Sequence, residues 1–224
     1  MRLVCSEYGI EIELQENQTG VLLVENSSAF QRMIYDLINQ DRATTGMFVL
    51  SENEKICNLS KEAEIIINPF SLDCNEKRVQ QKLFQEILEK ALGDNLQETT
   101  ELNRMIVSYL ETVTLSMPYN IIFELEEKIQ GLLKIYGVAI EQNEENLLEK
   151  IINYLCILSR LCKIKYFFFV NLKTFLETEE LEKLYEFAAY EKIHLILLEN
   201  KESGRLSDEK WCILDKDLCI IKCE

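Results

Sequence analysis

The amino-acid sequence predicts an α/β fold with a head made from both ends of the chain and a helical leg inserted between them. Strand-like apolar runs gather near the two ends, whereas the middle of the chain has helical periodicity. Only two prolines and seven glycines interrupt the 224 residues, so no flexible linker is indicated. We therefore assign residues 1–74 and 163–224 to the head and residues 75–162 to the leg.

The N-terminal residues predict a hairpin followed by a strand-turn-helix unit. Alternating apolar and polar residues over 3–14, with a break at Gly9, are typical of two short antiparallel strands. The wholly apolar run 21–24 indicates a strand buried on both faces. The polar residues 26–28 are typical of a helix N-cap, and helical spacing then continues to about Gln40.

Further strands are predicted from short apolar or β-branched runs at residues 47–50, 64–67, 166–170, 194–198, 211–214 and 218–222. A helix from Thr178, its predicted N-cap, to about Ala189 separates two of them. Strand, helix and strand in this order favour a parallel right-handed crossover. The acidic tripeptide 215–217 is typical of a turn between the last two strands.

The predicted leg contains three stretches in which apolar side chains recur at helical spacing. They are Val79, Leu83, Phe84, Ile87, Leu88 and Leu92; Leu102, Ile106, Tyr109, Leu110 and Val113; and Leu147, Leu148, Ile151, Ile152, Leu155 and Leu158.

The composition indicates a cytoplasmic protein without a membrane segment. The apolar runs are far shorter than the roughly 20 residues that span a bilayer. Eight cysteines without a CxxC pair, and a single histidine, predict buried thiols rather than structural zinc. A formal charge of -15 opposes non-specific attraction to nucleic acid, although a local cluster of lysines can still bind phosphates.

The sequence contains no recognisable catalytic motif, so we expect a binding protein rather than an enzyme. A phosphate loop would follow the strand at 21–24, but residues 25–29 lack the glycines and the lysine that a nucleotide phosphate requires. The sole histidine, His194, begins an apolar strand and has no neighbouring nucleophile motif. We therefore predict no nucleotide cofactor and a structural role for His194.

Basic residues cluster where the last predicted leg helix meets the strand at 166–170. Arg160, Lys163 and Lys165 either contact phosphates or stabilise the helix C-terminus. Lys61, with Lys55, is a weaker signal of the same kind. Carboxylates gather at Glu124, Glu126 and Glu127, at Glu141, Glu144 and Glu145, and at Asp215 and Asp217. Each acidic group is either a calcium site or a solvated surface.

Several segments, in order and spacing, are similar to those of the Csn-two family of CRISPR-associated proteins, the spacer-acquisition proteins of type II-A systems. The segments that carry the resemblance are 21–30, 136–141, 167–171, 175–181, 197–199 and 213–217. They extend over nearly the whole chain.

The resemblance implies a head like a degenerate P-loop hydrolase fold without its phosphate loop, plus a helical leg. It also implies a ring-shaped homotetramer that binds double-stranded DNA ends through lysines and has no catalysis of its own. Lys163 and Lys165, with Arg160 and Lys61, are the expected DNA contacts. Calcium is the expected metal, with Glu124, Glu126 and Glu127 as ligands. CRISPR integrase proteins and the effector nuclease are the expected protein partners.

Two other functions stay open on the sequence alone. One is an acidic protein-interaction module without DNA binding, and the other is a nucleotide-responsive α/β protein with an unconventional loop. The missing glycines and lysine argue against the second.

Overall fold

The computed structural model describes residues 1–40, 46–123 and 129–222 of the chain. Contacts divide the protein into two compact units: Met1–Asp73 together with Gln142–Glu224, and Cys74–Glu141. The second unit thus ends at Glu141, whereas the sequence placed the end of the leg at residue 162. The helix predicted over residues 147–158 belongs to the first unit, where it packs against the helix over residues 178–191.

The first unit contains a large sheet of six strands in the order β10-β9-β3-β8-β7-β6. The strands are β3 (Thr19–Val24), β6 (Ala63–Ile66), β7 (Tyr166–Val170), β8 (His194–Glu199), β9 (Glu209–Leu214) and β10 (Ile220–Lys222). All neighbours are parallel except the antiparallel pair of β9 and β10. The predicted parallel pairing of β7 with β8 is confirmed, with Tyr166 opposite His194.

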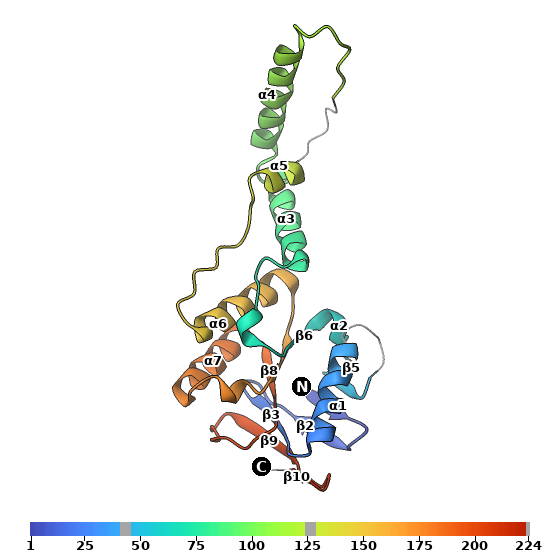
Figure 1. Cartoon of the computed structure of the whole chain (residues 1–224), viewed down its shortest axis with the longest axis vertical. Coiled ribbons are helices and arrows are strands. Elements are labelled where there is room, and N and C mark those ends of the chain that lie inside the picture. Colours follow the sequence, from blue (N-terminus) through green and yellow to red (C-terminus); the bar gives the residue numbers. More distant parts are fainter. Residues whose placement is uncertain (41–45, 124–128, 223–224) are drawn as a thin grey trace. The chain divides into compact units, whose positions relative to one another are not determined.

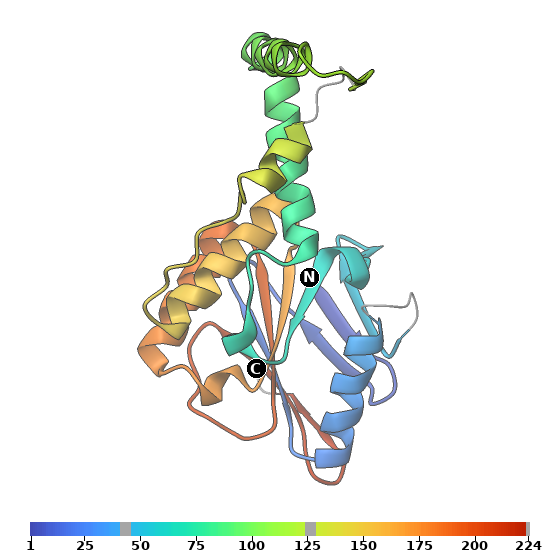
Figure 2. The same cartoon turned by 45° about the horizontal axis from the view of Figure 1, so that its top comes forward.

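Helices cover both faces of the large sheet (Figures 1 and 2). Helix α1 (Ser27–Gln40) lies on one face, and α6 (Leu147–Ile157) and α7 (Thr178–Glu191) lie on the other. Every residue of β3 and β7 is buried, as expected for apolar strands enclosed on both sides. The α/β fold class is therefore confirmed.

A second sheet lies on the α1 side of the large sheet and shares its core. It has four antiparallel strands in the order β2-β1-β4-β5. They are β1 (Arg2–Cys5), β2 (Ile10–Glu13), β4 (Phe48–Glu52) and β5 (Lys55–Ile56). The predicted N-terminal hairpin is confirmed, with Gly9 at a φ of 67° in its turn. Phe48 packs in one apolar cluster with Met33 of α1 and Phe168 of β7.

The two predicted helix caps have different outcomes. Asn26 caps α1, since its Oδ1 accepts the backbone N–H groups of Ser28 at 3.1 Å and Ala29 at 3.0 Å. Thr178 was predicted to cap α7 but is the first helical residue. Glu177 is the cap, and its backbone N–H donates to Glu180 Oε2 at 2.9 Å. The acidic capping box was missed because a threonine beside it is the commoner cap.

Short elements connect the first unit. They are α2 (Leu59–Glu62), the 3-10 turns η1 (Pro69–Ser71) and η3 (Leu172–Thr174), and the π-helical turn η2 (Leu158–Cys162), which continues α6. Of the cysteines predicted as buried thiols, Cys5, Cys74 and Cys212 are buried, Cys57, Cys156 and Cys162 are partly buried, and Cys219 is exposed. It lies in the turn before β10, where the apolar run had indicated a strand interior.

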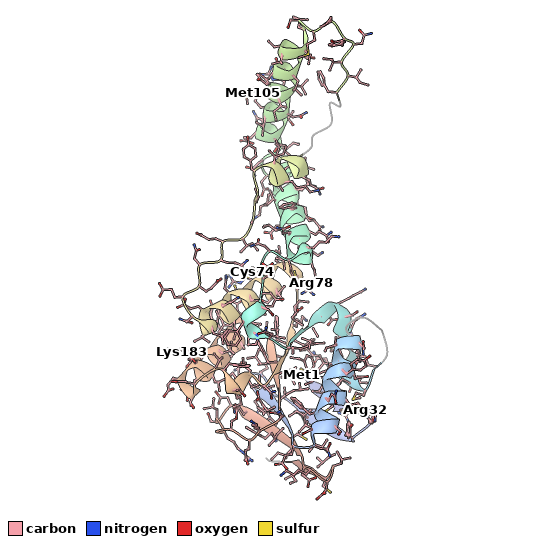
Figure 3. All side chains as sticks on the ribbon, in the orientation of Figure 1. Met1, Arg32, Cys74, Arg78, Met105 and Lys183 are labelled. Atoms are coloured by element: carbon pink, nitrogen blue, oxygen red, sulfur yellow. The ribbon has the colours of Figure 1, made fainter. Side chains whose placement is uncertain are left out.

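The second unit consists of α3 (Lys77–Leu92), α4 (Leu96–Thr114) and α5 (Ile129–Ile135). Its chain ends are held together by Asn75, whose side chain exchanges two hydrogen bonds of 2.8 Å with the backbone of Ile140. Helix α4 keeps an apolar face exposed, including Met105, which is labelled in Figure 3. Among the described residues, no helix is long and apolar enough to cross a bilayer.

Candidate nucleic-acid interface

A pocket of about 790 Å³ lies at the amino ends of β7 and β8, within the first unit. We call it the amino-edge pocket. It is lined by Met1, Gln15, Glu16, Asn17, Glu52, Asn53, Ser159, Lys163, Ile164, Lys165, Ala189, Glu191, Lys192, Ile193 and His194. Met1 is labelled in Figure 3. The pocket collects residues from five separate stretches of the chain, so it exists only in the folded protein.

Lys163 and Lys165, two of the predicted DNA contacts, both line this pocket. Lys163 ends the η2 turn in the left-handed conformation, with a φ of 61°. The backbone of Lys165 is fixed on both sides, since its N–H donates to Glu62 O at 2.9 Å and its carbonyl accepts the N–H of His194 at 2.8 Å. The junction between helix and strand therefore presents both lysines at the same edge of the sheet.

Lys192 is a third lysine of the pocket, and the sequence analysis missed it. It ends α7 with a φ of 56°, in the same left-handed conformation as Lys163. Both lysines follow a helix and precede a strand of the same parallel sheet. Parallel strands begin at the same edge, so a lysine two or three residues before each strand was the available signal.

The other two predicted DNA contacts lie elsewhere. Arg160 does not line the pocket; its guanidinium forms a two-pronged ion pair with the carboxylate of Glu191, which does. Lys61 is an exposed residue of α2 and lies outside the pocket lining. The structure thus brings together two of the four predicted basic residues and gives Arg160 a carboxylate partner.

The carboxylate of Glu52, at the end of β4, is shared by several groups at this pocket. Its Oε2 accepts the hydroxyl of Tyr166 at 3.1 Å and lies 3.9 Å from Lys165 Nζ. Its Oε1 lies 3.6 Å from Nε2 of His194. Burial raises the pKa of the Tyr166 hydroxyl, with further contributions from Cys57 and Glu52. The phenol therefore stays protonated and donates to Glu52 throughout the physiological pH range.

His194 stacks on the ring of Tyr166 with the centroids 5.5 Å apart and the planes inclined by 15°. Burial lowers the pKa of the imidazole, and the nearby Glu52 carboxylate opposes this effect without cancelling it. The histidine is therefore neutral at pH 7. The sequence predicted only a structural role for His194; the structure adds a titratable contact with Glu52.

The predicted calcium ligands Glu124, Glu126 and Glu127 lie outside the described residues. Within the part of the chain that the structure describes, no group of three or more His, Cys, Asp or Glu side chains is placed to hold a metal ion. Asp215 instead organises its own turn, since its Oδ1 accepts the N–H groups of Asp217 at 2.9 Å and Cys219 at 2.7 Å.

The place where a phosphate loop would stand is filled by a helix cap. Besides capping α1, Asn26 donates through Nδ2 to the carbonyl of Lys216 at 2.9 Å, which ties the cap to the turn before β10. The backbone amides of Ser28 and Ala29 already donate to Asn26 and are not open to a phosphate.

A known protein family matches most of the chain. The model of the family described as CRISPR-associated protein (Cas_Csn2) matches residues 40–218. The matched region includes the three lysines of the amino-edge pocket, Glu52 and His194, as well as all of α3 and α4. The chain therefore belongs to the Cas_Csn2 family of CRISPR-associated proteins, as the sequence predicted.

Proposed function

We propose that this CRISPR-associated protein binds double-stranded DNA without sequence preference, as a ring-shaped homotetramer, and supports the acquisition of new spacers. In this role it has no catalysis of its own and works beside the CRISPR integrase proteins and the effector nuclease. Family membership supports the CRISPR context. DNA binding, the assembly and the step in acquisition are our inference.

One observation carries the DNA-binding proposal: Lys163, Lys165 and Lys192 meet at one pocket on a molecule with a formal charge of -15. Lys163 and Lys192 form no ion pair with a carboxylate of the described residues. Lys165 has only the 3.9 Å approach to Glu52. Ammonium groups without close carboxylate partners are available to phosphate oxygens, and phosphate contacts carry no base preference.

Reversing the charge of Lys163 and Lys165 together is expected to weaken binding of linear duplex DNA by about tenfold or more at low salt, because two phosphate contacts become repulsive. The dependence of the affinity on salt should also become shallower. Fluorescence anisotropy of a labelled duplex, titrated at several salt concentrations, measures both effects.

Lys183→Glu is the matched control, because this lysine is exposed on α7 and does not line the pocket (Figure 3). Lys183→Glu changes the net charge by the same amount as each of the two pocket substitutions, and it should alter the affinity for DNA far less. If the native protein fails to bind linear duplex DNA at any salt concentration, with or without calcium, the proposal is wrong.

The self-association part of the proposal is supported by the apolar face of α4. Leu102, Met105, Tyr109 and Val113 follow one another at helical spacing and are 41%, 54%, 68% and 43% exposed. A stripe of this kind on a helix normally packs against another surface. A second copy of the chain supplies such a surface with the same spacing, and isologous contacts between copies are the commonest way to form closed oligomers.

Met105→Lys combined with Tyr109→Lys should therefore reduce the molar mass in solution, because two ammonium groups cannot be buried in an apolar contact. Light scattering coupled to size-exclusion chromatography measures this mass. Glu111→Lys is the control, since its position lies on the opposite side of α4, and it should leave the mass unchanged. Equal masses for all three proteins would contradict a role of this face in assembly.

Calcium binding by Glu124, Glu126 and Glu127 stays a prediction.

The alternative of an acidic interaction module without DNA binding makes one distinct prediction: an oligomer that binds neither linear nor circular DNA. A gel shift with both DNA forms, alongside the mass measurement, separates the two functions.

A further inference from the structure

The charges around the amino-edge pocket are nearly balanced when His194 is neutral. Its lining contains three lysines and the N-terminal ammonium group of Met1, against three glutamates, Glu16, Glu52 and Glu191. Arg160 neutralises Glu191 from outside the lining. Two helices also end here, at Cys162 and at Glu191, and each C-terminus contributes roughly half a negative charge. With the amino group of Met1 included, the pocket is slightly positive when His194 is neutral, and one added proton on His194 raises its positive charge further.

His194 is the group placed to take that proton. The charged or titratable groups facing it are Glu52 from β4, Tyr166 from β7, Lys165 just before β7, and the amino group of Met1 before β1. Of these, only Glu52 favours the protonated imidazole by its charge. Its Oε1 atom lies 3.6 Å from Nε2 of His194, close enough to form a charge-assisted hydrogen bond after a small rotation.

Protonation of His194 also changes what Lys165 does. The same Glu52 carboxylate is 3.9 Å from Lys165 Nζ, so the lysine and the histidine compete for one anion. When His194 is charged, Glu52 has a closer cation, and Lys165 is released toward the pocket. The two consequences act in the same direction: the pocket gains a positive charge, and one of its lysines loses a carboxylate partner.

We propose that the amino-edge pocket binds a phosphate group between Lys163, Lys165 and Lys192, and that His194 takes up a proton when the phosphate binds. The phosphate is either one of the DNA backbone or a free phosphate ion, since both present the same oxygens to the lysines. The inference rests on the proposed DNA binding for its biological meaning, but the pocket itself can be tested without DNA.

Binding and protonation must reinforce each other, because a bound anion stabilises the imidazolium as much as the imidazolium stabilises the anion. Burial lowers the pKa of free His194, so the histidine is mostly neutral near pH 7.5 and mostly charged only in clearly acidic solution. Phosphate binding therefore strengthens as the pH falls, and the bound phosphate raises the pKa of His194.

His194 is the only histidine of the chain, so its titration can be followed without ambiguity. The NMR signal of its imidazole Cε1 proton is recorded from pH 5 to pH 8 at constant ionic strength, with inorganic phosphate or with chloride alone. The pKa of His194 should be higher in phosphate. In the folded variant Lys163→Ala with Lys192→Ala this difference should disappear, whereas Lys183→Ala should retain it. Identical titrations of the native protein in the two salts would overturn the proposal.

Duplex DNA distinguishes the two sources of phosphate. The affinity of the native protein for a linear duplex should increase by about tenfold more than that of His194→Gln between pH 7.5 and pH 5.5, because only the native pocket gains the charge. General protonation of carboxylates affects both proteins equally and cancels in this comparison. Parallel pH dependences for native and variant proteins, with DNA bound by both, would refute the link to His194 and leave the proposed function standing.

A third outcome would support the phosphate pocket and contradict the proposed DNA binding. If no duplex binds at any pH but inorganic phosphate still raises the pKa of His194, the pocket is a site for free phosphate, and the proposed DNA binding is wrong.

Discussion

Replacing Lys173 with methionine is expected to lower the free energy of unfolding by about 3–5 kcal/mol, because it leaves a carboxylate buried without its cation. Lys173 lies in the η3 turn after β7, and its side chain is only 2% exposed. Its Nζ donates to both carboxylate oxygens of Glu209, at 2.6 and 2.8 Å, and to the carbonyl of Gly204 at 2.6 Å. All three ammonium hydrogens thus have acceptors.

The carboxylate of Glu209, at the start of β9, is fully buried and fully hydrogen-bonded. Besides Lys173, it accepts the hydroxyl of Tyr185 at 2.7 Å, Nε1 of Trp211 at 2.8 Å and the backbone N–H of Leu206 at 3.0 Å. Lys173 also lies 4.8 Å from the centre of the Trp211 ring. This network connects α7, the loop before β9 and the turn after β7, so losing its cation affects all three elements.

Urea denaturation followed by fluorescence measures the loss, since Trp211 is the only tryptophan of the chain and is part of the network. Arg2→Met, which removes an exposed partner of Glu11, is the control and should have little effect. Combining Lys173→Met with Glu209→Gln should recover part of the stability, because no buried charge is then unpaired. A loss below about 1 kcal/mol in the single variant would show that the pair is not important for stability.

Titration of Glu199 is expected to lower the free energy of unfolding of the native protein by about 3 kcal/mol between about pH 4.5 and pH 7. Replacing Glu199 with glutamine should abolish this loss. Glu199 ends β8 and is 2% exposed. Burial raises the pKa of its carboxyl group to about 7, although the N–H of Lys173 donates to its Oε1 at 3.1 Å and favours the charged form.

The direction follows from where the proton binds. Between the unfolded and the folded pKa, the folded protein holds a proton on Glu199 that the unfolded chain has lost, so stability is greatest below about pH 4.5 and falls as the pH rises through 7. The glutamine variant should be more stable than the native protein at pH 8 and similar to it at pH 4.5.

Urea denaturation of both proteins at pH 4.5, 6 and 8 tests this. Titration of His194 and of the other carboxylates contributes equally to both proteins and cancels in the difference. A difference between the proteins that does not change with pH would mean that folding does not raise the pKa of Glu199.

Local pattern was sufficient to predict most elements of the head. Alternation over residues 3–14 predicted the hairpin, and the uninterrupted apolar run of β3 predicted a strand buried on both faces. The polar cluster 26–28 predicted a helix N-cap, and the structure assigns that role to Asn26, whose side chain bonds amides only two and three residues away. In each case the interacting groups are close in sequence, so periodicity and residue type carry the information.

The sequence also placed Lys163 and Lys165 at a junction between helix and strand, but it did not show that Lys192 joins them. That lysine is 27 residues farther along the chain, and only the parallel pairing of β7 with β8 brings the two junctions to one edge. The pairing of Arg160 with Glu191 arises from the same meeting of two helix ends.

The sequence by itself determined the family, the α/β class and the local elements, because these depend on residue types and on short-range periodicity. Tertiary structure decided which compact unit contains α6, how Glu52 is shared between His194 and Lys165, and which carboxylate neutralises Lys173. The free energy of a charged group depends on its burial and on the partners within a few ångströms. Those partners come from strands and helices that lie far apart in the chain and meet only in the folded sheet.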